Sequence, residues 1–289
     1  MTRRADWDGF ASFELRSRDT AVTVVPELGA KVVSLRNLHT GREWMSFPGS
    51  FRKLFRNSPR DDFARSPVAG WDECLPTIAP CEWRGRALPD HGEVWGVPWK
   101  MDAAAWEQQQ IATTIQPPGS PFHFSRTIAV LGSLVRVSYR LTNRSGEPQE
   151  FLWAMHPLLA LRPGDQIELP PEEKRWLAQH PWLASLSFDD WTAKCGKVFI
   201  GPLREGYVAL INPITRDRLT FEWTSGPMNR LGIWLTRGGW NGHHHLALEP
   251  TNARCDSLAQ MARDGHDCTN VPAGGHLEWT IRLRVEPVS

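Results

Sequence analysis

Residues 277–286 read LEWTIRLRVE, with an apolar side chain at every second position and Glu, Thr or Arg between them. Successive side chains of a β-strand point to opposite faces, so this pattern predicts a strand with one face in a core and one in water. Residues 135–142, VRVSYRLT, alternate in the same way. These two stretches predict a sheet that buries one of its faces.

Turn residues join further stretches of this kind into hairpins. Residues 122–130 precede the second stretch, and the intervening 131–133, LGS, form a candidate turn. Residues 21–25 and 31–38 form another candidate pair, joined by 26–29, PELG. Further strands are expected at residues 106–115, 151–155, 207–211, 218–223, 231–235 and 244–249.

Helical periodicity is scarce. Residues 172–186 are expected to form a helical turn or two, interrupted at Pro181. Residues 252–262 are expected to form a short helix capped by Thr251 or Asn252. Many strands without regular alternation with helices favour an all-β fold, a large antiparallel two-sheet β-sandwich with a few short helices. Because the 23 Pro and 23 Gly are spread along the chain and mark no linker, we expect one domain over residues 1–289.

Composition and charge exclude several classes of protein. The 33 Lys and Arg against 32 Asp and Glu give a net charge of +1, which argues against a nucleic-acid binder or a membrane-surface protein. The most apolar run, residues 151–161, is too short to span a bilayer. The first ten residues carry four charges and do not form a signal peptide. The 15 Trp suit a large core and also the flat surfaces on which sugars stack.

The five cysteines show no metal-binding or disulfide pattern. They contain no Cys-x-x-Cys pair and no closely spaced set with histidine, so neither a zinc knuckle nor a disulfide framework is indicated. A reducing, cytoplasmic location is expected. The cysteines are Cys74, Cys81, Cys195, Cys255 and Cys268.

No phosphate-binding loop, dinucleotide-binding glycine pattern or nucleophile elbow is present. The candidate chemistry therefore lies in short polar motifs within Trp-rich segments. Residues 70–81 read GWDECLPTIAPC, and if Asp72 and Glu73 lie in extended chain they point to opposite faces. Only one of the two is then expected to line a given cleft, and a solvated acidic pair is the alternative.

Three further polar residues stand beside proline or glycine. His91 lies in the segment LPDHGEVW, where the flanking Pro and Gly indicate a turn that presents the imidazole. His156 and Glu249 each directly precede a proline, which favours extended backbone and a position at the end of a strand. A carboxylate in the apolar run LALEP is unfavourable to bury without a partner. A structural histidine and a salt-bridged structural glutamate are the alternatives.

The triplet His243, His244 and His245 suggests a metal site at first sight. Only His243 and His245 share a face of a strand, and Glu249 lies roughly 13 Å beyond His245 at about 3.3 Å per residue. Two histidines fall short of a closed zinc shell. We therefore interpret the triplet as a solvated run and expect no metal site.

Taken in order, the segments around Asp72, His91, His156 and Glu249 resemble the aldose 1-epimerase, or galactose mutarotase-like, family. The resemblance extends over essentially the whole chain and rests on short motifs in family order. It includes residues 25–35, VPELGAKVVSL, residues 40–43, TGRE, and the run from 231–234, LGIW, to the last strand. It implies a large antiparallel supersandwich with a sugar bound in an open cleft.

The resemblance also implies roles for individual residues. The family's catalytic acid maps onto His156 and its base onto Glu249, and a second histidine that binds the sugar near its ring oxygen maps onto His91. The family's aspartate on the sugar hydroxyls maps by spacing onto Asp190, with Asp189 adjacent.

Asp72, Glu73 and Trp153 complete the expected substrate-binding set. Better-known members of the family differ at Asp72 and Glu73, which leaves the substrate open. An arginine commonly precedes the first histidine in the family; the segment here is residues 60–65, RDDFAR, and the family's arginine is left unassigned. A phosphorylated sugar would require basic residues at the rim of the cleft, and the candidates are Arg52, Lys53, Arg56 and Arg60, with a solvated basic loop as the alternative.

Opening a sugar ring requires removal of the proton on the C1 hydroxyl and delivery of one to the ring oxygen. Glu, with a reference pKa of about 4.3, and His, near 6.5, suit these two tasks, and no cofactor or metal is needed. A mutarotase acting on a free or modified hexose is the first hypothesis. The alternatives are a carbohydrate-binding or sensing protein without turnover, and a lyase or another epimerase that uses Asp72 and Glu73. The sequence predicts a small-molecule sugar as partner and leaves the oligomeric state open.

Overall fold

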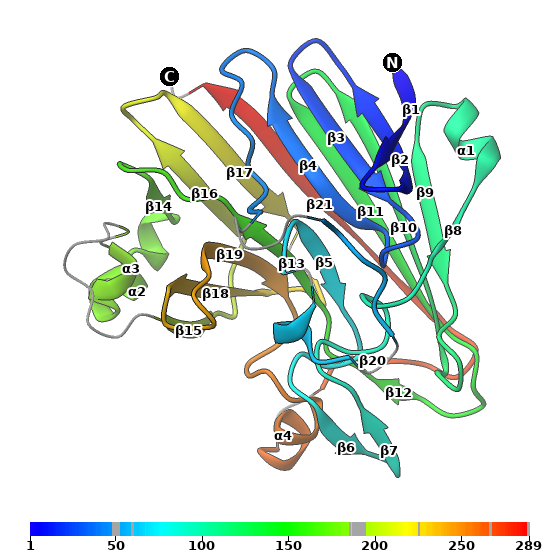
Figure 1. Cartoon of the computed structure of the whole chain (residues 1–289). Coiled ribbons are helices and arrows are strands. Elements are labelled where there is room, and N and C mark those ends of the chain that lie inside the picture. The colour runs from blue at the N-terminus through cyan, green and yellow to red at the C-terminus, as the bar shows by residue number, and fades with distance from the viewer. Residues whose placement is uncertain are drawn as a thin grey trace.

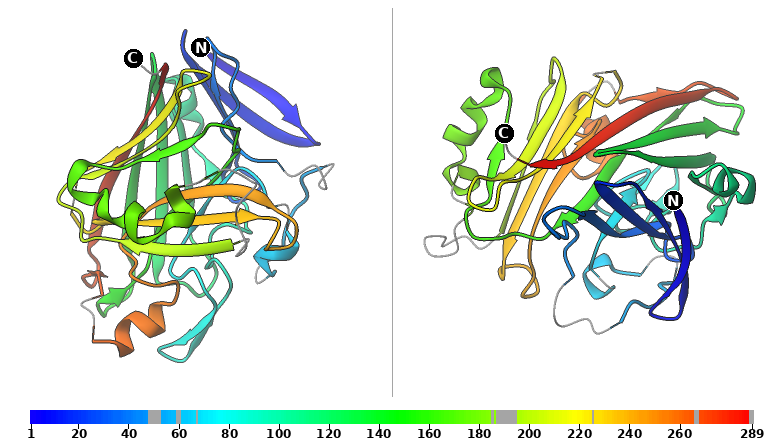
Figure 2. Two further views of the ribbon diagram at one scale, coloured as in Figure 1. Left: turned by 90° about the vertical axis from the view of Figure 1, so that its left-hand side faces the viewer. Right: turned by 90° about the horizontal axis from the view of Figure 1, so that it is seen from above.

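Two antiparallel sheets face each other in the computed structural model of this protein (Figure 1). The structure describes residues 1–47, 53–58, 61–66, 68–184, 186, 195–224, 226–265 and 268–287. The two chain termini lie at the same end of the sandwich in both side views (Figures 1 and 2). None of the helices in these described ranges is long and apolar enough to cross a membrane.

The first sheet has nine strands in the order β1-β2-β3-β4-β5-β13-β19-β18-β15. Its strands are β1 Thr2–Trp7, β2 Phe10–Arg16, β3 Thr20–Val25, β4 Lys31–Asn37, β5 Trp71–Cys74, β13 Ala154–Leu159, β15 Cys195–Ile200, β18 Arg230–Arg237 and β19 His244–Thr251. The sheet is twisted, as sheets of L-amino acids are, and β18 and β19 run almost across the direction of β3 and β4 in Figure 1.

The second sheet has eight strands in the order β14-β16-β17-β21-β11-β10-β9-β8. Its strands are β8 Lys100–Met101, β9 Ile111–Ile115, β10 Phe122–Leu131, β11 Leu134–Asn143, β14 Gln166–Glu168, β16 Gly206–Asn212, β17 Asp217–Trp223 and β21 His276–Pro287. Two small ladders join β6 Cys81–Trp83 to β7 Arg86–Leu88, and β12 Gln149–Glu150 to β20 Asn270–Val271.

The helices are short and lie at the margins of the sandwich (Figure 2). They are α1 Ala103–Glu107, α2 Arg175–Gln179, α3 Pro181–Ala184 and α4 Leu258–Arg263, with 3₁₀ turns η1 Phe63–Arg65 and η2 Pro171–Glu173. Helix α4 begins after Ser257, whose side chain accepts a hydrogen bond from the amide of Gln260. The cap is therefore Ser257, and the prediction of Thr251 or Asn252 was wrong because those residues still belong to β19 and its end.

The alternating stretches build the core as expected. In β21 the apolar positions from Trp279 to Val285 are buried between the sheets, and β11 buries Val135, Val137, Tyr139 and Leu141 beside it. One apolar cluster from both sheets extends in sequence from Leu15 to Val285. The prediction of an all-β, antiparallel two-sheet sandwich is confirmed. The single domain over residues 1–289 stays a prediction, which this shared core supports.

One stretch of secondary structure differs from the expectation, and a second agrees with it. Residues 106–115 contain the end of helix α1 and only then strand β9, because Asp102 caps the helix by accepting hydrogen bonds from the amides of Ala104 and Ala105. Residues 171–184 form the 3₁₀ turn η2 and the short helices α2 and α3, and Pro181 begins α3, which agrees with the expected interruption at that proline.

Candidate active site

One row of positions crosses the pocket-facing side of the nine-stranded sheet. Val32 of β4 pairs with Trp71 of β5, which brings the next residues, Lys31 and Asp72, side by side as an ion pair. Asp72 in turn stands opposite His156 of β13. The row continues to Glu249 of β19, which stands opposite Gly232 of β18. Side chains at one register point to the same face. Four ionisable groups that lie far apart in the sequence are thereby brought into one line.

Two prolines interrupt the ladder at this row. Pro157 and Pro250 lie inside β13 and β19, so the prediction that His156 and Glu249 end their strands was wrong. The two strands are paired on both sides of the row, at Ala154 with Thr251 and at Leu158 with Ala247. Proline has no N–H to donate to a ladder. His156 and Glu249 therefore face each other across an opened stretch, with Nε2 of the histidine 3.7 Å from Oε1 of the glutamate.

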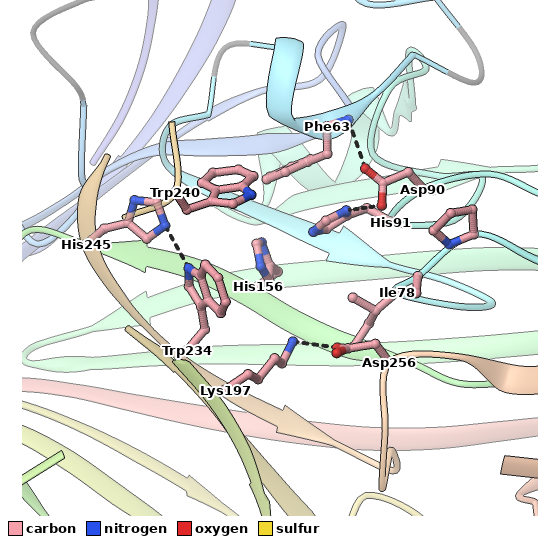
Figure 3. A pocket seen from close by; sticks show the side chains of 12 residues that line it. Phe63, Ile78, Asp90, His91, His156, Lys197, Trp234, Trp240, His245 and Asp256 are labelled. Atoms are coloured by element: carbon pink, nitrogen blue, oxygen red, sulfur yellow. Dashed lines mark hydrogen bonds and ion pairs between the residues drawn. The ribbon is translucent and has the colours of Figure 1, made fainter. Parts of the chain in front are cut away.

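A pocket of about 210 Å³ opens above this row. Figure 3 shows His156 in its middle, with Asp90 and His91 on one side and Trp234, Trp240 and His245 on the other. Lys197 and Asp256 close the third side (Figure 3). The lining consists of Phe63, Ile78, Ala79, Pro80, Asp90, His91, His156, Lys197, Trp234, Trp240, His245 and Asp256.

A tight turn presents His91 to the pocket, as the sequence predicted. The residue has a φ of 57°, and a Cβ on the following Gly92 would lie 2.1 Å from the carbonyl oxygen of Leu75, so only glycine fits there. The Nδ1 atom of His91 lies 3.0 Å from Oδ1 of Asp90, and its ring stacks on Phe63 at 3.9 Å. These contacts fix the ring and leave its other nitrogen on the side of His156 (Figure 3).

The lysine on β15 joins two carboxylates. Lys197 Nζ lies 2.9 Å from Oε2 of Glu249 and 2.9 Å from Oδ1 of Asp256. Burial lowers the pKa of Lys197, but the two carboxylates outweigh burial and raise it well above its usual value, so the ammonium stays charged. Gly232 leaves room for this arrangement, since a Cβ there would lie 2.9 Å from Oε2 of Glu249.

Burial shifts both members of the central pair toward their uncharged forms. The pKa of Glu249 is raised by burial, although the neighbouring Lys197 opposes the shift. Burial, His91 and Lys197 together hold the pKa of His156 well below its usual value. Among the residues that the structure describes, Oε1 of Glu249 and Nδ1 of His156 are buried without a hydrogen-bond partner. Buried polar atoms of this kind are rare unless a ligand or a reaction uses them.

The histidine triplet is only partly solvated. His243 and His245 are 5% and 2% exposed, and only His244 faces solvent, so the interpretation as a solvated run was wrong for two of the three. The alternation of β19 places His245 on the pocket face, where its Nε2 accepts a hydrogen bond from Trp234 Nε1 at 3.3 Å. Burial and His243 lower the pKa of His245 to about 3, so this imidazole is neutral.

Asp72 and Glu73 point to opposite faces, as predicted. Asp72 lies on the pocket-facing side, where Lys31 pairs with it, and is 1% exposed. Glu73 points into the core between the sheets and accepts hydrogen bonds from Arg126, Tyr139 and Trp153. The pocket lining includes neither carboxylate.

Three of the expected substrate-binding residues, Asp72, Glu73 and Trp153, thus do not line the pocket. Trp153 is fully buried in the core, where its Nε1 donates to Glu73, and offers no surface for a sugar. The structure brings together His91, His156 and Glu249, with Asp72 beside them in the same row. Asp189 and Asp190 lie outside the described residues, as do Arg52 and Arg60.

Sequence reasoning missed several groups that line the pocket. The lysine in residues 195–200, CGKVFI, is the single charge in a strand, and that pattern could have singled out Lys197. Trp234 stands in the apolar run 231–235, LGIWL, and gives no signal of its own. Asp256 and Asp90 lie in loops, and only the tertiary structure brings them to the site.

Comparison with known proteins gives matches in structure alone. No protein-family model matches the chain, and no curated protein matches it. A candidate aldose 1-epimerase from Klebsiella pneumoniae superposes with a TM-score of 0.75 at 12% identity, covering 96% of this chain and 79% of that one. A galactose mutarotase-like protein from Clostridium acetobutylicum gives 0.72 at 12% identity, covering 100% and 99%.

A galactose mutarotase related enzyme from Lactobacillus acidophilus gives a TM-score of 0.68 at 13% identity, covering 96% of this chain and 98% of that chain. At these identities the likeness concerns the fold. The strand order, the two facing sheets and these neighbours agree with the resemblance read from the sequence motifs. The chain has the galactose mutarotase-like fold.

Proposed function

We propose that the protein is an aldose 1-epimerase that interconverts the α and β anomers of a hexose or modified hexose. The observation that carries this proposal is the pairing of His156, which lines the pocket together with His91, with the buried Glu249 beside it at 3.7 Å. The neighbours described as epimerases or mutarotase-like proteins support the same reaction class.

Glu249 is the base in this mechanism. Its Oε1 has no hydrogen-bond partner among the described residues and accepts the proton of the C1 hydroxyl. Lys197 holds the other oxygen and favours the ionised carboxylate. His156 delivers a proton to the ring oxygen, the ring opens, the C1 carbonyl turns, and the ring closes with the two roles reversed. Each transfer typically contributes about 10² to 10⁴ in rate.

The pair must carry one proton for this cycle. Because burial holds the pKa of His156 low, its imidazole is neutral in the free protein at pH 7. The acid role therefore requires that the pair takes up a proton in the complex with the sugar. The two groups titrate as a pair, since they are buried within 4 Å of each other.

The shape of the pocket suits one sugar ring. Its volume of about 210 Å³ lies below the roughly 300–1,000 Å³ of pockets for drug-sized ligands. The ring faces of Trp234 and Trp240, 6.0 Å apart and nearly perpendicular, offer apolar surface for the C–H face of a sugar. Asp90 and Asp256 offer acceptors for hydroxyl groups.

The test is exchange between anomers, measured by NMR on free hexoses, uronic acids, sulfonated sugars and hexose 6-phosphates. The wild-type protein should accelerate exchange of at least one sugar, and His156→Ala should abolish the acceleration. Full activity in His156→Ala would refute the mechanism. Sugar binding without accelerated exchange would instead support a carbohydrate-binding or sensing protein. The lyase hypothesis loses the support of Glu73, which lies in the core.

Two further proposals concern the cellular location of the protein and its binding partner. The cysteine pattern supports a cytoplasmic location, and the proposed reaction implies a small-molecule sugar as the partner.

A further inference from the structure

Cys74 is a buried free thiol beside the acid/base pair. It lies two positions after Asp72 in β5 and therefore on the same face, opposite Ala154, which is two positions before His156. One donor atom each from Cys74, His91 and His156 lie within 4.8 Å of one another. Within the described ranges of the chain, no other three His, Cys, Asp or Glu residues meet this spacing.

This donor set matches the chemistry of zinc. A thiolate and two imidazoles are ligands that Zn²⁺ prefers, and three protein ligands leave a fourth position for water or a ligand. Here that position faces the pocket, because His91 and His156 both line it. With Zn–N bonds of about 2.0–2.1 Å and a Zn–S bond of about 2.3 Å, the ligand atoms around a zinc ion lie about 3.5 Å from one another. The three donor atoms here lie within 4.8 Å of one another, so the side chains must approach by up to about 1 Å.

The neighbours of the two imidazoles also suit a metal site. Histidines that bind metals almost always donate their other ring nitrogen to a carboxylate or carbonyl, which fixes the tautomer. Asp90 makes this contact with Nδ1 of His91 at 3.0 Å, and Phe63 stacks on the same ring. His156 has a buried Nδ1 without a hydrogen-bond partner among the described residues.

We propose that Cys74, His91 and His156 bind Zn²⁺ and that the bound ion blocks epimerisation. Binding releases the thiol proton of Cys74 to solvent. The ion occupies a lone pair on His156, which then cannot carry a proton to the sugar. The ion is therefore an inhibitor of a reaction that needs no metal. The inhibition rests on the proposed function, whereas the binding site does not.

Co²⁺ is the direct probe of the site, because a thiolate ligand gives it a charge-transfer absorption. Reduced protein should bind one equivalent of Co²⁺ with this band, and Zn²⁺ should displace it. Cys74→Ser should lose the band. Cys81→Ser is the matched control and should keep it, since Cys81 packs against the apolar cluster that contains Cys74 but is not one of the three proposed ligands. Asp90→Asn should weaken Co²⁺ binding about 10- to 100-fold. A cooperative thermal unfolding transition shows that a variant is folded. If Cys74→Ser does not fold, Cys74→Ala takes its place in the experiment.

No thiolate band, or an equal affinity in wild type and in the folded Cys74 variant, would overturn the site. In the exchange assay, Zn²⁺ should inhibit wild type and Cys81→Ser at concentrations at least about tenfold below those needed for Cys74→Ser, each measured against its own metal-free rate. Binding that leaves exchange unaffected would overturn the inhibition. A protein without exchange activity would refute the proposed function, and the cobalt band would still decide the metal site.

Discussion

Two fully buried glutamates lie on opposite faces of the nine-stranded sheet, and their surroundings differ. Glu73, on the core face, accepts hydrogen bonds from Arg126, Tyr139, Trp153 and Trp71. Glu249, on the pocket face, is paired with Lys197 and has one oxygen without a hydrogen-bond partner in the described part of the chain.

This difference distinguishes a structural carboxylate from one poised for chemistry. A buried carboxylate that accepts hydrogen bonds at both oxygens, as Glu73 does, helps to make a core rigid and specific. A buried atom without a partner costs about 1–3 kcal/mol in desolvation, so its presence calls for a ligand or a reaction. Burial alone would have ranked the two glutamates equally, since both are 0% exposed.

The largest expected effect is on activity at Glu249. Glu249→Gln keeps the size of the side chain but removes the base, so anomer exchange should fall about 10²- to 10⁴-fold. Glu278→Gln is the matched control, because Glu278 is exposed on the second sheet and pairs with Arg140. NMR exchange rates measure both. Comparable rates in Glu249→Gln and Glu278→Gln would contradict the assignment of Glu249 as the reactive carboxylate.

The next effect is on stability at Glu73. Glu73→Leu leaves the fully buried Arg126 without its carboxylate, so the free energy of unfolding should fall by about 3–5 kcal/mol. Glu249→Leu should cost less, because Lys197 keeps its ion pair with Asp256. Urea denaturation compares the two variants. An equal loss in both would contradict the assignment of Glu73 as the structural carboxylate.

The pH dependence of stability should also report on the burial of Glu73. Burial raises the pKa of Glu73 to about 7, against the pull of Arg126, from a reference near 4.5. The folded protein then binds a proton that the unfolded chain releases, so this contribution is complete below about pH 4.5 and is lost as the pH rises through 7. It amounts to at most about 3 kcal/mol. Urea midpoints of wild type should show this slope, and Glu73→Gln should lack it; identical slopes would refute the raised pKa.

The smallest effect is expected at Gly232. A Cβ there would lie 2.9 Å from Oε2 and 3.3 Å from Cβ of Glu249, so Gly232→Ala should displace the carboxylate and slow exchange about tenfold. Gly146→Ala is the control, since its Cβ would meet nothing within 4 Å. A steady-state assay under saturating sugar measures both. Unchanged exchange in Gly232→Ala would show that the position of Glu249 tolerates movement.

Much of the fold followed from local pattern. Alternation in residues 277–286 and 135–142 predicted β21 and β11, because a strand buried on one face repeats every two residues. The start of helix α4 was harder to predict. It depends on the Ser257 cap, whereas Thr251, which could also cap a helix, is the last residue of β19. The sequence pattern also did not show whether Trp153 packs in the core or contacts a sugar; in the structure it is fully buried in the core.

The sequence by itself determined the sandwich, the opposite faces of Asp72 and Glu73, and the turn that presents His91, since these depend on neighbours along the chain. Only the tertiary structure placed His156 opposite Glu249 and joined Lys197 and Asp256 to the pocket. It also placed a thiol beside two imidazoles. Those contacts depend on the order of strands in a sheet, which local periodicity does not encode.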